Sequence, residues 1–291
     1  MLTVYRHNNL SGYIFLLPLF LFMAGFVLVP VVGTLLNSFY KDVPFLQSEF
    51  NGLDNYRSLG GDSSFWQSLR FSLLFVMAAV PLELLLGMAF ALVLHKATNS
   101  KALLWAAVLI PWAIPSAVSA RIWELIYNYN YGLANFVLTK FGLTTEPINW
   151  LGGSFSAFWA VTVADVWKTT PFVAIIILAG LQAVPDDFHE SAKIDGAGFI
   201  RRFFSLTLPL LKPVIVVALL FRTIDSLRVF DVIYVLTGGG PGGATSALSL
   251  YGYEYYLIGD FGYASTISVV LFVIAMALSI LYIRFSRFER E

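Results

Sequence analysis

Six long apolar segments constrain the fold of this chain more than any other feature of its sequence. About 20 consecutive apolar residues let a helix cross the hydrocarbon core of a bilayer. Charged residues make up only 12% of the chain, whereas a soluble domain carries about 25%. We therefore expect an all-α membrane protein, with residues 1–291 forming a single transmembrane domain. The six expected spans are approximately 11–38, 67–95, 103–127, 156–182, 206–236 and 263–286.

The first apolar segment has the position of a secretory signal peptide. It runs from Leu10 to about Phe39, which is far longer than the roughly 7–15 residues of a signal core, and no clear small-residue cleavage site follows it. It is therefore predicted to be an uncleaved membrane helix.

Eight prolines lie inside or at the ends of the expected spans. Each lacks a backbone N–H group, so kinks or breaks are expected, and neighbouring helices or polar groups must bind the freed carbonyls. These residues are Pro18, Pro30, Pro81, Pro111, Pro115, Pro171, Pro209 and Pro213.

The distribution of lysine and arginine predicts the orientation, because these residues concentrate in short cytoplasmic loops. Nine would lie on one side of the membrane: Arg6, Lys96, Lys101, Lys193, Arg201, Arg202, Arg284, Arg287 and Arg290. Four would lie on the other side: Lys41, Arg57, Arg70 and Lys140. The first set is therefore expected in the cytoplasm, together with both termini.

The composition argues against several kinds of site. The chain has no cysteine, which excludes disulfides, thiol catalysis and thiolate metal sites. The glycine-rich "TGGGPGG" at 237–243 is not followed by G-K-[ST], so it is not a P-loop. The three histidines are scattered in loops, and no metal-ligand spacing or nucleophile–base pair stands out. We therefore expect no catalytic residues, no metal site and no nucleotide site.

A charged stretch, "VPDDFHESAKIDGAG", separates the fourth and fifth apolar segments. Asp186 or Asp187 could cap the first turn of a helix, with Glu190 completing a capping box after Asp187. Gly196 and Gly198 then allow the helix to stop and the chain to turn. The pattern favours a short helix along the cytoplasmic surface, within a loop of about 185–205. A solvated loop is the alternative.

The fifth apolar segment carries charged residues at membrane depth, where an isolated charge is costly. Arg222 can pair with Asp225, and Arg228 with Asp231, because the partners are three residues apart. These charges could line a polar cavity. Alternatively, they could form ion pairs whose only role is to lower the cost of placing each charge at membrane depth. Four side chains share one helix face, at offsets 0, 3, 4 and 7: Arg222, Asp225, Ser226 and Val229.

Two further observations concern the other segments. Arg121 and Glu124 are expected to form a local ion pair, and Glu83 has no evident partner. The six segments do not repeat, and six helices are few for a complete transport pathway, so a partner with a similar bundle is expected.

The charged stretch resembles a known motif. Glu190-Ser191-Ala192, three residues, Gly196, nine residues and then Leu206-Thr207-Leu208-Pro209 is similar to the EAA loop of binding-protein-dependent ABC importer permeases. Ser191 replaces an alanine and Leu206 an isoleucine. Three more stretches resemble the carbohydrate branch, of the maltose and glycerol-phosphate type: "LIPWAIPSAVSARIWELIYN", "WKTTPFVAIIILAGLQAVP" and "VFDVIYVLTGGGPGGAT".

The resemblance implies the type I permease fold, in which the charged stretch is a cytoplasmic coupling helix. This helix would dock on an ATPase subunit, with Glu190 facing a basic residue there. The glycine-rich loop would lie near a docked binding protein, or it is simply a flexible turn. The implied coupling residues are Glu190, Ser191, Ala192, Asp195 and Gly196.

The resemblance also implies a substrate site, although each aromatic residue could instead pack between helices and Lys168 could snorkel. Charges stand where the maltose-type relative has neutral residues, so a different ligand is implied. Maltose, trehalose, a glucosylated polyol and a glycerol phosphate all remain open. The implied contacts are Trp112, Ser116, Lys168, Thr169, Phe172, Arg222, Asp225, Ser226 and Val229.

The expected function is therefore the permease subunit of an ATP-driven importer for a sugar or sugar-like solute, not an enzyme. The implied partners are a second permease, two cytoplasmic ATPases that bind ATP and Mg, and an extracytoplasmic binding protein. The implied location is a bacterial or archaeal inner membrane. The alternatives are a polytopic membrane enzyme, such as a lipid-linked glycosyltransferase, and a homo-oligomeric channel.

Overall fold

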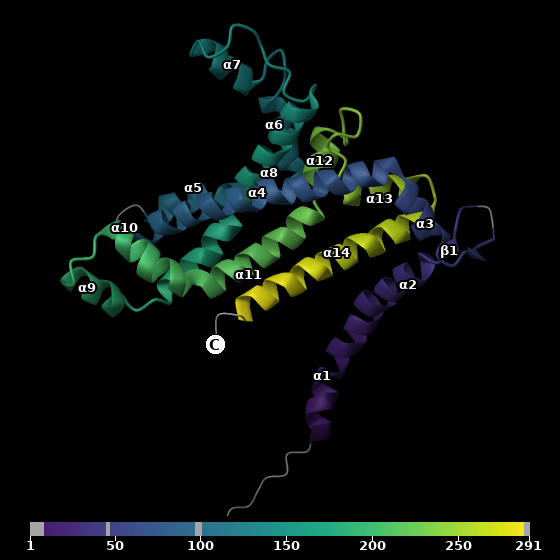
Figure 1. Ribbon diagram of the computed structural model, residues 1–291, viewed down its shortest axis with the longest axis horizontal. Helices are drawn as coiled ribbons and strands as arrows, with labels where there is room; N and C mark the ends of the chain where they lie inside the picture. The colour runs from purple at the N-terminus through teal and green to yellow at the C-terminus, as the bar shows by residue number, and fades with distance from the viewer. Residues whose placement is uncertain (1–8, 45–46, 97–100, 288–291) are drawn as a thin grey trace, which may run out of the picture. The chain divides into compact units, whose positions relative to one another are not determined.

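The computed structural model describes residues 9–44, 47–96 and 101–287, which are mostly helical (Figure 1). The expected all-α class is confirmed, apart from a hairpin of two-residue strands. The described residues divide into two compact units. One contains the residues up to Gly61 together with Gly252–Val270, and the other contains Asp62–Tyr251 together with the residues from Leu271.

The first unit begins with one long apolar helical stretch, Tyr13–Asn37. The hairpin is followed by a short helix that contains Asn55. The buried side chain of Asn55 donates hydrogen bonds to the carbonyls of Ser38 and Tyr40, at 3.0 and 2.9 Å, and so holds this helix against the end of the apolar stretch. The elements are α1 (Asn9–Met23), the π-helical turn η1 (Ala24–Leu28), α2 (Val29–Asn37), β1 (Tyr40–Lys41), β2 (Glu49–Phe50) and α3 (Asp54–Gly61).

The second unit holds most of the helices. Its elements are α4 (Ser63–Lys96), α5 (Lys101–Ala113), α6 (Ser116–Ile126), α7 (Leu133–Lys140), α8 (Ser154–Gln182), α9 (Asp186–Ile194), α10 (Phe199–Arg202), the π-helical turn η2 (Phe203–Thr207), α11 (Leu208–Leu227) and α12 (Asp231–Leu236). Two helices belong partly to each unit: α13 (Leu248–Leu257) and α14 (Phe261–Arg287).

The expected spans correspond to the apolar helices of the structure. Five stretches of described helix are long and apolar enough to cross a membrane, and the bent pair α5–α6 raises the number to six. Each overlaps one expected span. The stretches besides Tyr13–Asn37 are Ser63–Lys96, Ser154–Gln182, Phe199–Leu227 and Phe261–Arg284.

The bounds of the fifth span were predicted wrongly at both ends. The continuous helix runs over Phe199–Leu227, not over 206–236. The apolar residues after Leu227 continue the hydrophobic pattern, but the backbone leaves the helix at Arg228 and restarts as α12. At the other end, residues 199–205 are already helical, so the loop after α9 is shorter than expected.

Prolines break only one of the expected spans in the described residues. α5 and α6 meet at a bend of 97°, immediately before Pro115, which disfavours the helical conformation of the residue that precedes it. By contrast, α4 and α8 continue as helices through Pro81 and Pro171. The expected breaks at those two positions are absent.

The second unit is centred on α4 and α8, which pack along each other, with α11 against both (Figure 1). Gly87 permits this close approach, because a Cβ there would lie 2.7 Å from Cγ1 of Val173. Small residues allow such approach between membrane helices. The core at this interface consists of Ala91, Leu94, Val173, Ile177, Leu178, Leu181, Leu211 and Ala218.

Candidate functional site

A buried arginine lies where α4, α8 and α11 meet. The side chain of Arg222 is only 3% exposed. Its guanidinium binds Glu83 of α4 at two points, Nε to Oε2 at 2.5 Å and Nη2 to Oε1 at 2.7 Å. Nη2 also donates to Oδ2 of Asp165 on α8 at 3.2 Å. A planar guanidinium suits this two-point binding, so one cation joins three helices.

The partner of Glu83 is thus Arg222, 139 positions away in the sequence. Glu83 is completely buried, and its Oε1 also accepts a hydrogen bond from the Thr169 hydroxyl at 2.9 Å. The hydroxyl of Ser226 accepts from Nη2 of Arg222 at 3.0 Å. Because both acid and base are fully paired, they can be buried at membrane depth.

Asp225 connects this centre to a more exposed charge. Arg222 Nη1 lies 2.7 Å from its Oδ2, which confirms the expected pair, and Arg228 Nη2 lies 3.2 Å from its Oδ1. The expected pairing of Arg228 with Asp231 is wrong. Because α11 ends at Leu227, Asp231 is no longer one helical turn from Arg228. For the same reason Val229 is not on the helix face predicted for it.

Lys168 lies at the break between α5 and α6. Its Nζ donates to the carbonyl oxygen of Ile114 at 2.6 Å and to that of Trp112 at 3.5 Å. The last carbonyls of a helix lack intrahelical partners, and a cation at a helix C-terminus also interacts favourably with the helix dipole. The half-buried lysine therefore supplies hydrogen-bond donors to carbonyls that the break between the two helices leaves without partners.

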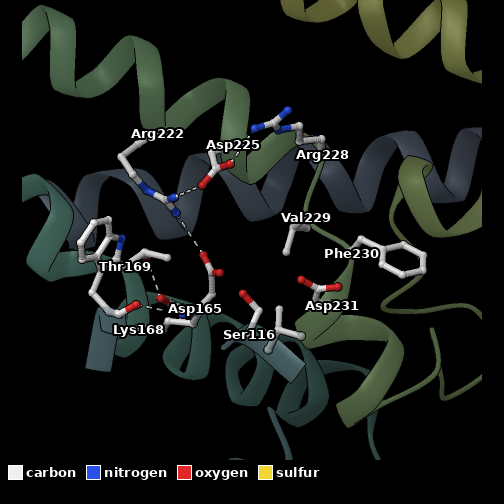
Figure 2. A pocket seen from close by; sticks show the side chains of 12 residues that line it. Ser116, Asp165, Lys168, Thr169, Arg222, Asp225, Arg228, Val229, Phe230 and Asp231 are labelled. Atoms are coloured by element: carbon white, nitrogen blue, oxygen red, sulfur yellow. Dashed lines mark hydrogen bonds and ion pairs between the residues drawn. The ribbon is translucent and has the colours of Figure 1, made fainter. Parts of the chain in front are cut away.

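A polar cavity of about 340 Å³ opens beside this centre (Figure 2). Seven of the nine residues expected to contact substrate line it: Trp112, Ser116, Lys168, Thr169, Arg222, Asp225 and Val229. The other residues of its wall are Asp165, Arg228, Phe230, Asp231 and Val232. Val229 reaches the cavity from the loop after α11 rather than from the helix.

An adjoining cavity of about 420 Å³ has a more aromatic wall, which includes Phe172, Phe221 and Trp112. Phe172 stacks on Trp112 with ring centroids 6.2 Å apart, and it meets the edge of Phe221 at 6.4 Å. Ser226, the remaining expected contact, lines neither cavity. It is buried behind Arg222 and orients that side chain.

One acid at the cavity, Asp165, was not predicted, although it lies inside the fourth apolar segment, where the rule applied to Arg222 and Asp225 would have identified it. Asp231 was predicted as the partner of Arg228 in a possible cavity wall, but not as a contact of the substrate. In Figure 2 its carboxylate points into the cavity on the side of Ser116.

The charged stretch folds as the short helix α9, as expected. It ends at a Schellman motif, in which Gly196 N–H donates to Lys193 at 3.0 Å and Ala197 N–H to Ala192 at 2.9 Å. Gly196 has φ of +76°, which only glycine adopts without strain. The prediction of an aspartate cap is wrong, because the N-cap is Pro185 and both aspartates lie inside the helix.

The expected coupling residues lie together on and just after α9. Glu190, Ser191, Asp195 and Gly196 are exposed, and Ala192 is half-buried. Large apolar side chains near them are also exposed, including Ile194 and Ile200. This part of the described chain therefore offers both an acid and apolar groups to a partner.

Comparisons with known proteins show the family to which the chain belongs. Residues 83–288 match the family model described as binding-protein-dependent transport system inner membrane component. The chain is 50% identical to the trehalose/maltose transport system permease protein MalF of Thermococcus litoralis, over 99% of this chain and 97% of that protein. It is 38% identical to the sulfoquinovosyl glycerol transport system permease protein SmoG of Agrobacterium fabrum, over 96% and 91% of the two chains.

A solved structure shares the fold. It is the bacterial alginate ABC transporter in complex with an alginate pentasaccharide-bound periplasmic protein, with a TM-score of 0.83, 21% identity and coverage of 96% and 94% of the two chains. None of these relatives supports the membrane-enzyme or channel alternatives. The chain belongs to the family of binding-protein-dependent transport system inner membrane components, and it is a multi-pass permease subunit of an ABC importer rather than an enzyme.

Proposed function

We propose that this chain forms half of the translocation pathway of an ATP-driven importer for a sugar or sugar-like solute. The observation that carries the proposal is the polar cavity of about 340 Å³ between α6, α8, α11 and α12, at the charged centre of otherwise apolar helices. Ionisable groups at membrane depth mark solute pathways. The names of the two relatives, MalF and SmoG, refer to carbohydrate-containing solutes.

The lining suits such a solute. Ser116 and Thr169 offer hydroxyl groups, Asp225 offers a carboxylate, and Trp112 and Phe172 offer ring faces. Sugars present hydroxyls that need hydrogen-bond partners, as well as apolar C–H faces that pack on aromatic rings. Arg222 holds Asp225 in place rather than reaching solute itself, because all three of its guanidinium nitrogens are engaged.

The proposed partners follow from the family. A second, related permease would complete the pathway, two cytoplasmic ATPases would bind ATP and Mg, and an extracytoplasmic binding protein would deliver the solute. Such a binding protein is named in the alginate transporter complex. The distribution of basic residues described above supports a location of both termini and α9 on the cytoplasmic side of a bacterial or archaeal inner membrane.

The proposed mechanism is alternating access. Closure of the ATPases would move α9, and the helices would open the cavity outward, toward the binding protein. Reopening of the ATPases would then release the solute inward. Glu190 is the acid that would pair with a basic residue of the ATPase, and an interfacial charge pair of this kind can be worth about 2–5 kcal/mol when one partner is removed.

Solute uptake tests the role of the cavity. The importer, reconstituted with its ATPase and binding protein, is expected to accumulate labelled trehalose or maltose only with ATP. Trp112→Ala should lower this uptake by up to about tenfold, since the stacking contacts of an aromatic ring contribute about 0.5–1.5 kcal/mol. Trp159→Ala is the matched control, because Trp159 is a partly exposed tryptophan of α8 outside this cavity. Uptake without ATP, or equal loss in both variants, would contradict the proposal.

Subunit recovery tests the role of α9. Glu190→Ala should leave the permease inserted in the membrane but reduce ATPase co-purification or uncouple ATP hydrolysis from uptake. Asp187→Ala, an exposed acid on the same helix, should have a much smaller effect. Normal uptake and complex recovery in the Glu190 variant would rule out this coupling role.

A further inference from the structure

We propose that Asp231 is a specificity-determining residue, which accepts hydrogen bonds from solute hydroxyls and excludes negatively charged solutes. This inference rests on the proposed function and deepens it, because it names neutral, hydroxyl-rich molecules as the solute class. Relatives of this fold are named for trehalose and maltose, which are neutral, and for alginate, which is acidic. Proteins that share this fold must therefore use particular side chains to distinguish neutral solutes from charged ones.

Asp231 differs from the other acids of the cavity wall, Asp165 and Asp225, because those two pair with arginine side chains. It is the first residue of α12, its side chain is exposed, and it lines the cavity opposite the charged centre (Figure 2). Arg228, its nearest base in sequence, pairs with Asp225 instead. Within the described residues Asp231 makes no ion pair, so its oxygen atoms keep their full capacity to accept hydrogen bonds.

The bases of the cavity are already engaged. Each nitrogen of the Arg222 guanidinium donates to a carboxylate. The Lys168 ammonium donates to the carbonyl of Ile114 at 2.6 Å, in the break between α5 and α6. Arg228 shares Asp225 with Arg222. A carboxylate or sulfonate on a solute would therefore share each of these cations with an existing partner.

The acids of this region differ in their partners. Glu83, Asp165 and Asp225 each contact Arg222, whereas Asp231 contacts no base among the described residues. A solute anion in a partly water-excluded cavity would be repelled by the unpaired acid. A sugar hydroxyl, in contrast, donates a charge-assisted hydrogen bond to the same acid, which is stronger than a bond between neutral groups.

The experiment compares two matched probes on the assembled importer in nanodiscs, with the binding protein omitted so that its own selectivity plays no part. The probes are trehalose and trehalose monocarboxylate, in which one CH₂OH group is oxidised to a carboxylate. Dissociation constants are measured by saturation-transfer NMR titration. The wild type should bind trehalose at least about tenfold more tightly than the monocarboxylate, and Asp231→Asn should reduce this ratio to about threefold or less.

Three further variants separate specificity from folding. Asp231→Glu keeps the charge and should keep the discrimination. Asp231→Ser is used if the asparagine variant fails to assemble, and it should lose the discrimination. Asp54→Asn is the matched control, because Asp54 is an exposed acid of α3 that pairs with Arg57; its ratio should equal that of the wild type.

Two results would overturn the inference: an unchanged ratio in Asp231→Asn, or a wild type that binds both probes equally or neither. ATP-driven trehalose uptake by the same complex, with its binding protein restored, tests the proposed function separately. If uptake proceeds but the ratio does not depend on residue 231, only the role of Asp231 is wrong. If no sugar is taken up with ATP, the proposed function itself fails.

Discussion

The two charged regions of this protein use the same residue types in opposite ways. In α9, acids and bases lie in one short exposed stretch, and the helix ends at a glycine motif formed by neighbouring residues. At the centre of the apolar helices, Arg222 is buried and depends on Glu83 and Asp165, which are distant in sequence. Local chemistry therefore suffices for the first region, whereas the second exists only when three helices are packed.

This difference has an energetic consequence. A charge pair in water contributes about 0–1 kcal/mol, because solvent solvates each partner when the pair is broken. A buried charge that loses its partner has no such alternative. The same chemical change should therefore have very different effects in the two regions, and the following variants test this, from the largest expected effect to the smallest.

Removal of Arg222 should have the largest effect. Arg222→Met leaves Glu83 buried without its cation and should destabilise the protein by about 3–5 kcal/mol. The double variant Glu83→Gln/Arg222→Met should recover part of this loss, because the charge of the completely buried Glu83 is then removed, while Asp165 still lacks its cation. Thermal unfolding and the yield of monodisperse protein in detergent measure both effects. A double variant less stable than Arg222→Met would show that the pair itself, rather than the isolated charge, determines the loss.

Loss of Lys168 should have an intermediate effect. Lys168→Met leaves the carbonyls of Trp112 and Ile114 without their donor and should destabilise the protein by about 1.5–3 kcal/mol. Hydrogen exchange should increase around residues 112–118, at the break. Lys193→Met on the exposed helix α9 is the control, with little change expected at that break. Equal exchange in both variants would mean that the break is stable without the lysine.

Gly196→Ala tests the local character of α9. Alanine at φ of +76° costs about 1 kcal/mol, so the last turn of α9 should fray, with faster hydrogen exchange confined to 190–198. Gly198 has φ of −64°, which alanine adopts without strain, so Gly198→Ala is the matched control. A fall in the melting temperature as large as that of Arg222→Met would contradict the view that α9 is an independent local structure.

The smallest effect should come from Arg121→Ala. Arg121 and Glu124 lie only 2.5 Å apart, closer than many of the contacts of Arg222, but their side chains are 67% and 41% exposed. The expected loss is below about 0.5 kcal/mol. Unfolding measurements at low and high salt provide the check. A loss comparable to that of Arg222→Met would refute the claim that burial, rather than distance, determines the energy of these pairs.

The sequence predicted the helical class, the approximate spans and the location of α9. It also predicted most of the residues that line the cavity, because a family resemblance marked them and because charges at membrane depth are conspicuous. It did not predict where the fifth apolar segment ends. Residues 228–236 are as apolar as the helix before them, so hydropathy alone continues the span past Leu227, although the backbone does not.

The sequence by itself determined the elements whose signals are local: long apolar helices, from composition, and the end of α9, from Gly196. Only the tertiary structure decided which charges pair across different helices. It assigned Glu83 and Asp165 to Arg222, placed Lys168 at the broken helix and left Asp231 free in the cavity. The physical reason is that a buried charge must be compensated by whatever groups packing brings within hydrogen-bond distance, and that proximity is not encoded by spacing along the chain.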